Sequence, residues 1–171
     1  MNQIDELFAF LKSNLPERLM SAAVGADAWM DDIQLTHAAK AWGLGQRRIM
    51  IRRYSAVFAW ERWPYREHDP DIPFALVGAW LIEHANAHYN GMELEPPDVF
   101  TQLMNNGDAI ITITVPLADD IILVEDAENG VIPLQGKRYS LADAEVNVAT
   151  KGWIYGAGGR GAPVEVMGDA G

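Results

Sequence analysis

The chain has 171 residues, of which 49% are hydrophobic, and its 24 acidic and 13 basic residues give a formal net charge of −11. This length fits one ordinary domain, and the apolar share is sufficient for a hydrophobic core. So acidic a chain repels free nucleic acid and anionic membranes, which argues against a domain that grips DNA. Because there is no cysteine, disulfides, thiolate zinc sites and a cysteine nucleophile are excluded.

The first residues predict an amphipathic helix that Pro16 ends. Its apolar residues recur at steps of three and four: Ile4, Leu7, Phe8, Leu11 and Leu15. Charged residues between them, such as Asp5 and Lys12, are not typical of a secretion signal. The longest apolar run, residues 72–82, is far shorter than the ~20 residues that span a bilayer. We therefore expect a soluble intracellular protein that does not contact a membrane.

The segment that follows is predicted to change from irregular to β-rich. Residues 28–35 favour a strand that two adjacent aspartates interrupt, and residues 36–48 favour a polar loop because glycines punctuate them. Aromatic and branched side chains become frequent from residue 49 onward. Residues 53–61 therefore predict a central strand.

Residues 73–89 predict a helix. Asp71 can cap it, Pro73 stands in its first turn, and Asn90-Gly91 ends it. Its first half is apolar on nearly every side, so the helix has to be covered on more than one side. We expect a sheet on one face and a neighbouring subunit on another.

The second half of the chain predicts further strands. Residues 99–104 and 109–115 flank Asn105-Asn106-Gly107-Asp108, which is the strongest hairpin signal because Asn and Gly accept positive φ. Short strands over residues 121–125, 131–134 and 145–155 follow. We therefore predict a single α+β domain over residues 1–155, with a mixed or antiparallel β-sheet packed against helices, and a flexible Gly-rich tail over residues 156–171.

Six tryptophans are many for this length. Tryptophan is enriched at the energetic centre of protein interfaces. We predict subunit or partner contacts for Trp60, Trp63 and Trp80. The alternative is a tryptophan-rich core.

Arg47, Arg48, Arg52 and Arg53 form a dense basic cluster. Guanidinium groups pair well with carboxylates, so a contact with a neighbouring subunit and a solvated strand end have similar weight. Contact with DNA phosphates ranks third, because four arginines give little long-range attraction in so acidic a chain.

His84 and His88 lie one helical turn apart, a spacing at which two imidazoles can share a zinc ion. The metalloprotease motif needs a glutamate directly after the first histidine, and Ala85 occupies that place. No third ligand is evident. A structural role is therefore favoured, and we expect no cofactor.

Four stretches carry a resemblance to a known family: RRYSAVFAW, DPDIPFALVGAWLIEHAN, VFTQLMNNGDAIITITVPLADDIILVED and ENGVIPLQG. A β-rich segment, an apolar helix around Ala79-Trp80-Leu81, an Asn-rich turn and an alternating strand over residues 110–117 follow in this order. The order resembles the phage tail completion protein R of P2-like, contractile-tailed phages. The similarity covers the middle of the chain and leaves both ends unassigned.

The resemblance implies a virion protein with a phage tail-terminator-like fold and no catalytic activity. Such a protein forms a hexameric ring, caps the head-proximal end of the tail tube, contacts tail tube, sheath and neck proteins, and supports head–tail joining. It acts in the tail–neck region after assembly in the host cytoplasm, and DNA passes through it without specific binding. Acidic side chains facing the channel would repel DNA, and we assign this role to Asp119, Asp120, Glu125 and Asp126.

Two readings from other classes stay open at this point. The first is a small metal-dependent hydrolase that uses His84 and His88. The second is an acidic adaptor or inhibitor that binds a protein partner as a monomer.

Overall fold

The computed structural model describes residues 2–84 and 91–142. The chain divides into two compact units. We call the first, Asn2–Thr36 with Ile51–Asp119, the helical unit; the second, the strand unit, contains His37–Met50 and the described residues 120–142. The predicted domain end at residue 155 and the Gly-rich tail lie outside the described residues, and a single domain stays a prediction.

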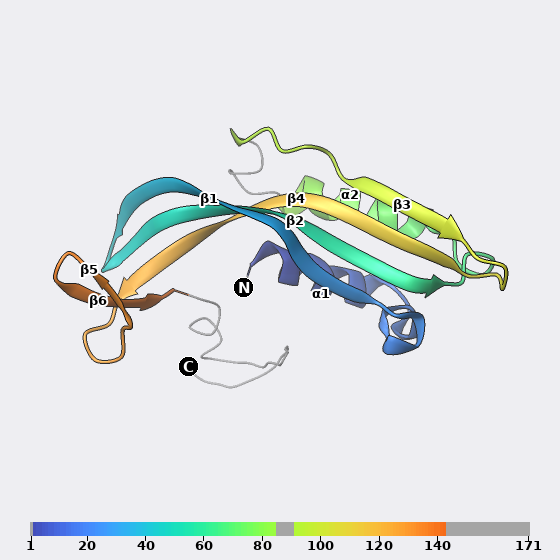
Figure 1. Ribbon diagram of the computed structural model, residues 1–171, viewed down its shortest axis with the longest axis horizontal. Helices are drawn as coiled ribbons and strands as arrows, with labels where there is room; N and C mark the ends of the chain where they lie inside the picture. The colour runs from blue at the N-terminus through green and yellow to red at the C-terminus, as the bar shows by residue number, and fades with distance from the viewer. Residues whose placement is uncertain (1, 85–90, 143–171) are drawn as a thin grey trace. The chain divides into compact units, whose positions relative to one another are not determined.

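The strands form a six-stranded sheet in the order β1-β2-β4-β6-β5, and β3 also pairs with β4 (Figure 1). The strands are β1 (Asp27–Gly43), β2 (Gln46–Trp63), β3 (Asp98–Leu103), β4 (Ala109–Glu125), β5 (Ile132–Leu134) and β6 (Lys137–Leu141). The helices are α1 (Gln3–Asn14) and α2 (Asp71–His84), with the 3-10 turns η1 (Glu17–Met20) and η2 (Ala22–Val24). Strand β4 pairs antiparallel with β3 and β6, and β5 pairs antiparallel with β6. The predicted α+β class is confirmed.

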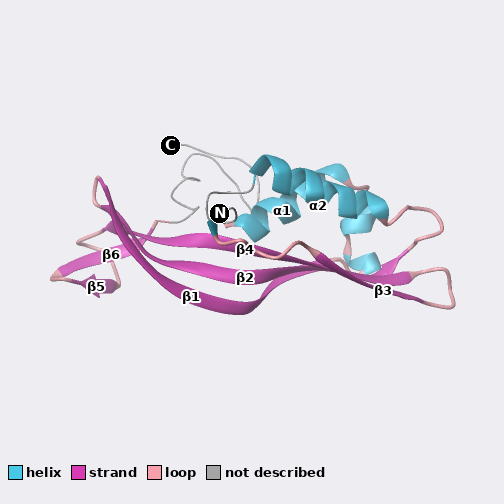
Figure 2. Ribbon diagram, turned by 90° about the horizontal axis from the view of Figure 1, so that it is seen from above, coloured by secondary structure: helices cyan, strands magenta, loops and turns pink. Residues whose placement is uncertain are grey.

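In the helical unit, α1 and α2 lie on the same face of the sheet (Figure 2). Alternate residues of β4 are buried on this face, from Ala109 to Leu117, while Thr112 and Thr114 between them are partly exposed. The period of two follows from the pleat of the strand, and it is the alternation that the sequence predicted. This face and the helices enclose the hydrophobic core.

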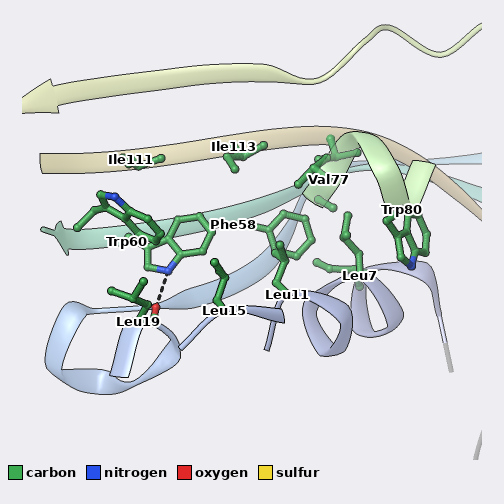
Figure 3. Close-up of a cluster of buried hydrophobic side chains, with 14 of the residues drawn as sticks. Leu7, Leu11, Leu15, Leu19, Phe58, Trp60, Val77, Trp80, Ile111 and Ile113 are labelled. Atoms are coloured by element: carbon green, nitrogen blue, oxygen red, sulfur yellow. Dashed lines mark hydrogen bonds between the residues drawn. The ribbon is translucent and has the colours of Figure 1, made fainter. Parts of the chain in front are cut away.

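The core of the helical unit joins α1 to both central strands (Figure 3). Leu7 and Leu11 point from α1 toward Phe58 on β2, and Val77 and Trp80 enter from α2. A helix of 12 residues is marginal in isolation, so α1 depends on this packing for its stability.

The predicted loop over residues 36–48 is wrong. Strand β1 continues to Gly43, and a two-residue turn, Leu44-Gly45, leads directly into β2. The backbone φ angles at these two positions are 54° and 76°, as a hairpin turn with two left-handed residues requires. The glycines serve this tight turn, and the polar composition reflects a strand that is exposed along most of its length.

Other predicted helices and strands agree better with the structure. The helix is confirmed as α2 up to His84, and the hairpin around Gly107 is confirmed as β3 and β4. Residues 121–125 belong to β4 rather than to a separate strand, and β6 was missed. The predicted strand over 145–155 lies outside the described residues. Over the part that is described, no helix has both the length and the hydropathy needed to cross a bilayer.

Candidate interaction surfaces

Asp119 is an internal group of the helical unit. It is 9% exposed. Its Oδ1 accepts the backbone N–H of Gln3 at 3.1 Å, and its Oδ2 accepts the hydroxyl of Tyr54 at 2.5 Å and lies 3.5 Å from Nη2 of Arg52. The carboxylate therefore caps the N-terminus of α1, where unpaired N–H groups favour negative charge. Asn2, the residue at the cap position, makes no such bond with its own side chain.

Tyr54 is held in its protonated form by this network. Burial raises the pKa of Tyr54 above its ordinary value of 10.0, and the Asp119 carboxylate raises this pKa further. A neutral phenol can donate to the carboxylate, whereas a phenolate beside it would be repelled.

This gives a prediction about alkaline pH. Because the folded-state pKa of Tyr54 is raised, its contribution to stability is complete below about pH 10 and is lost as the pH rises above that value. The free energy of unfolding of the unmodified protein is expected to fall more steeply between about pH 9 and pH 11 than that of Tyr54→Phe. Urea titrations across this range measure both slopes; parallel pH profiles would contradict the assignment.

The basic cluster is divided between the two units. Arg52, in the helical unit, pairs with Asp119 and also lies over the ring of Tyr54, 5.6 Å from its centroid. In the strand unit, Arg48 pairs with Asp120 at 3.2 Å and donates to the carbonyl of Ala38. These arginines have intramolecular partners in the single chain.

The remaining two arginines are partly exposed. Arg47, in the strand unit, donates to the side chain of Gln135 at 3.3 Å. Arg53 lies on β2 in the helical unit. A role in subunit contacts stays a prediction for the whole cluster.

Two of the predicted acidic side chains organise turns of the strand unit. Glu125 accepts the ammonium of Lys137 at 3.0 Å, and this pairing raises the pKa of Lys137. Asp126 accepts the N–H of Asn129 at 2.9 Å and the hydroxyl of Ser140 at 2.8 Å, and these bonds lower the pKa of Asp126. Both carboxylates are more exposed than that of Asp119. They are therefore the better candidates for side chains that face a channel, and this role stays a prediction.

The three tryptophans predicted for partner contacts lie in the core. Trp60, Trp63 and Trp80 are 2% exposed or less. Trp60 and Trp63 meet edge to face with ring centroids 5.4 Å apart, and the indole N–H of Trp60 donates to the carbonyl of Leu19 at 2.8 Å. The chain itself covers these three side chains. Apolar side chains that it leaves exposed are better candidates for a contact with a partner.

Helix α2 leaves a stripe of apolar side chains exposed. It buries Pro73, Val77 and Trp80, and its exposed residues include Ile72, Ala75, Ala79 and Ile82. These four follow one another at steps of three, four and three, so they share one side of the helix, away from the core. Ile82 is 86% exposed. We call these four residues the α2 stripe.

The turn between β1 and β2 is a second exposed apolar site, and it belongs to the strand unit. Leu44, at the turn, is 98% exposed, and Trp42 is 43% exposed. A pocket of about 320 Å³ opens beside this turn and is lined by residues that include Gly45, Arg47 and Tyr139. We call Trp42 and Leu44, with the turn that carries them, the hairpin tip.

His84 packs against aromatic rings. Its ring stacks on that of Trp80, with centroids 5.4 Å apart, and lies 6.3 Å from the ring of Phe10. Its Nδ1 lies 3.3 Å from the carbonyl oxygen of Trp80. His88 lies outside the described residues, and the described residues contain no group of three side chains suited to hold a metal ion.

Comparison with known protein families assigns the chain to a family. No curated protein and no solved structure matches the chain. A family model does match, over residues 1–143, which is most of the chain. The resemblance that the sequence carried is thereby confirmed, and the chain belongs to the P2 phage tail completion protein R family.

Proposed function

We propose that this phage tail protein is a ring-forming terminator. In this proposal a hexamer caps the head-proximal end of the tail tube, contacts tube, sheath and neck proteins, and supports the joining of tail to head. DNA passes through the ring without specific binding. The protein makes and breaks no covalent bond.

The observation that carries the proposal is the apolar surface of α2. A helix of a monomeric domain typically has one apolar face and one polar face. Helix α2 buries one face in the core and exposes the α2 stripe on another. An exposed apolar surface of this kind marks a contact with another protein. Family membership makes virion components the natural partners.

A ring requires that each subunit present two different surfaces, because contacts around a rotation axis are heterologous. The α2 stripe and the hairpin tip are two such surfaces, one in each unit of the chain. The strong negative charge of the chain also suits a passage through which DNA has to slide.

The proposal predicts a defect in joining. In cells infected with a phage that lacks this protein, filled heads and separate tails are expected to accumulate, and adding the purified protein to the extract should restore infectious particles. Electron microscopy and plaque counts measure both. Normal yields of joined particles without the protein would reject the proposal.

The state of the purified protein separates this reading from the monomeric adaptor. Native mass spectrometry of the protein alone and of tails that carry it is expected to show six copies per ring. A monomer that binds tails singly would support the adaptor instead.

A further inference from the structure

The hairpin tip is strained and exposed at once. Leu44 has a φ of 54°, in the left-handed region that residues other than glycine rarely adopt. Its side chain is also 98% exposed, so it contributes almost nothing to the packing of its own chain. Glycine at this position would relieve the strain and remove the exposed apolar surface. A leucine there is explained if its side chain is buried by a partner.

The charges around the hairpin tip differ from those of the rest of the chain. Lys40 and Arg47 lie within a few residues of the turn, and the carboxylate of Glu125, which lies against Gly45, is paired with Lys137. Among the described residues, the strand unit has five basic and four acidic side chains, whereas the helical unit has six basic and 16 acidic ones. The hairpin tip is therefore an apolar projection on the less acidic unit, and a partner with an acidic rim would complement it.

The α2 stripe is an apolar surface with acidic residues at its rim. Its two alanines lie between two isoleucines, so the exposed side chains in the middle of the helix are small and leave room for a partner's side chain. Asp71 and Glu83 stand next to Ile72 and Ile82 in the sequence, and both are exposed. An apolar side chain from a partner can pack on the two alanines while basic groups beside it meet these carboxylates.

We propose that the hairpin tip of one copy docks on the α2 stripe of a second copy. This inference rests on the proposed ring, because it names the contact that joins neighbouring subunits. Two different patches meet in it, so each subunit uses one patch toward each neighbour, and the contact can repeat around a ring. Complementary charge and complementary apolar surfaces both favour a second copy as the occupant.

Cross-linking tests the pairing with no thiol from this chain other than the one introduced, because its sequence has no cysteine. Gln46→Cys places a thiol beside the hairpin tip, Ala79→Cys places one in the α2 stripe, and Ser13→Cys on α1 is an exposed control. With a short bis-maleimide, the mixture of the first two variants is expected to yield a cross-linked dimer, both free and on tails. The mixture of Gln46→Cys with Ser13→Cys should not.

Several results would overturn the pairing. A dimer formed by Ala79→Cys alone, with none in the mixture, would show that α2 stripes meet each other. A Gln46→Cys/Ala79→Cys chain that cross-links only within itself would show that the tip docks on its own helix. Cross-links to a different tail protein, in place of this chain, would assign the surface to that partner.

Leu44→Gly separates docking from folding. It is expected to keep or raise the thermal stability of the chain, because the strain is relieved, and to weaken self-association at least tenfold, because a buried leucine is lost. Unchanged association would overturn the docking while leaving the ring proposal intact. If the unmodified protein neither associates nor supports joining, the proposed function fails and the docking fails with it.

Discussion

Replacing Asp119 with alanine is expected to lower the free energy of unfolding by about 3–5 kcal/mol, the cost of breaking a buried charged pair. The change removes the acceptor of the Gln3 N–H and the Tyr54 hydroxyl, and it leaves Arg52 without its carboxylate. The Nε of Arg52 already lacks a hydrogen-bond partner among the described residues. The positive charge of the Arg52 guanidinium would then lack its paired carboxylate, and the N-terminus of α1 would lose its cap.

Urea unfolding followed by circular dichroism measures this effect. Asp98→Ala is the matched control, because Asp98 is an exposed aspartate of β3 in the same unit. It is expected to change stability by less than about 0.5 kcal/mol. Asp119→Asn keeps the shape and some acceptor capacity but loses the charge, and its cost should fall between the two. Equal costs for Asp119→Ala and Asp98→Ala would refute the assigned role.

Replacing Trp60 with alanine is expected to cost about 3–5 kcal/mol of unfolding free energy, as for other large-to-small changes in a core. The indole is 1% exposed, stacks edge to face on Trp63, and donates to the carbonyl of Leu19. Trp60→Phe keeps much of the apolar volume but leaves that carbonyl unpaired, at a cost of about 1–3 kcal/mol.

Trp29 supplies the contrasting variant. It is 44% exposed on β1, so Trp29→Ala is expected to change stability by less than about 1 kcal/mol. Thermal unfolding of Trp60→Ala, Trp60→Phe and Trp29→Ala measures how much each tryptophan side chain contributes to the stability of the folded chain. A cost for Trp29→Ala equal to that for Trp60→Ala would contradict the core assignment.

Features with a local signal could be predicted from the sequence. The Asn-Gly turn between β3 and β4 and the alternation along β4 depend on a few neighbouring residues, and both were found. Helix α2 was also found, because its apolar residues and its start and stop signals lie close together in the sequence. Its cover by a neighbouring subunit stays a prediction.

Features that depend on distant residues could not be predicted in the same way. Strand β1 shows little alternation because it is exposed along most of its length, and its glycines looked like those of a loop. Asp119 looked like a surface acid, because nothing near it in the sequence indicates that Gln3, Tyr54 and Arg52 surround it. Burial of Trp60 likewise depends on η1, whose Leu19 carbonyl accepts its N–H.

The cap of α1 has a consequence for synthesis on the ribosome. The carboxylate that closes this helix lies 116 residues downstream of Gln3, the residue it caps. Helix α1 therefore waits uncapped for several seconds after its synthesis, since translation adds roughly 5–20 residues per second. Until β4 emerges, the core that covers the leucines of α1 also lacks Ile111, Ile113 and the other residues that β4 contributes. Nascent chains are expected to depend on chaperones during this interval, and to become resistant to protease only once residue 119 has left the exit tunnel.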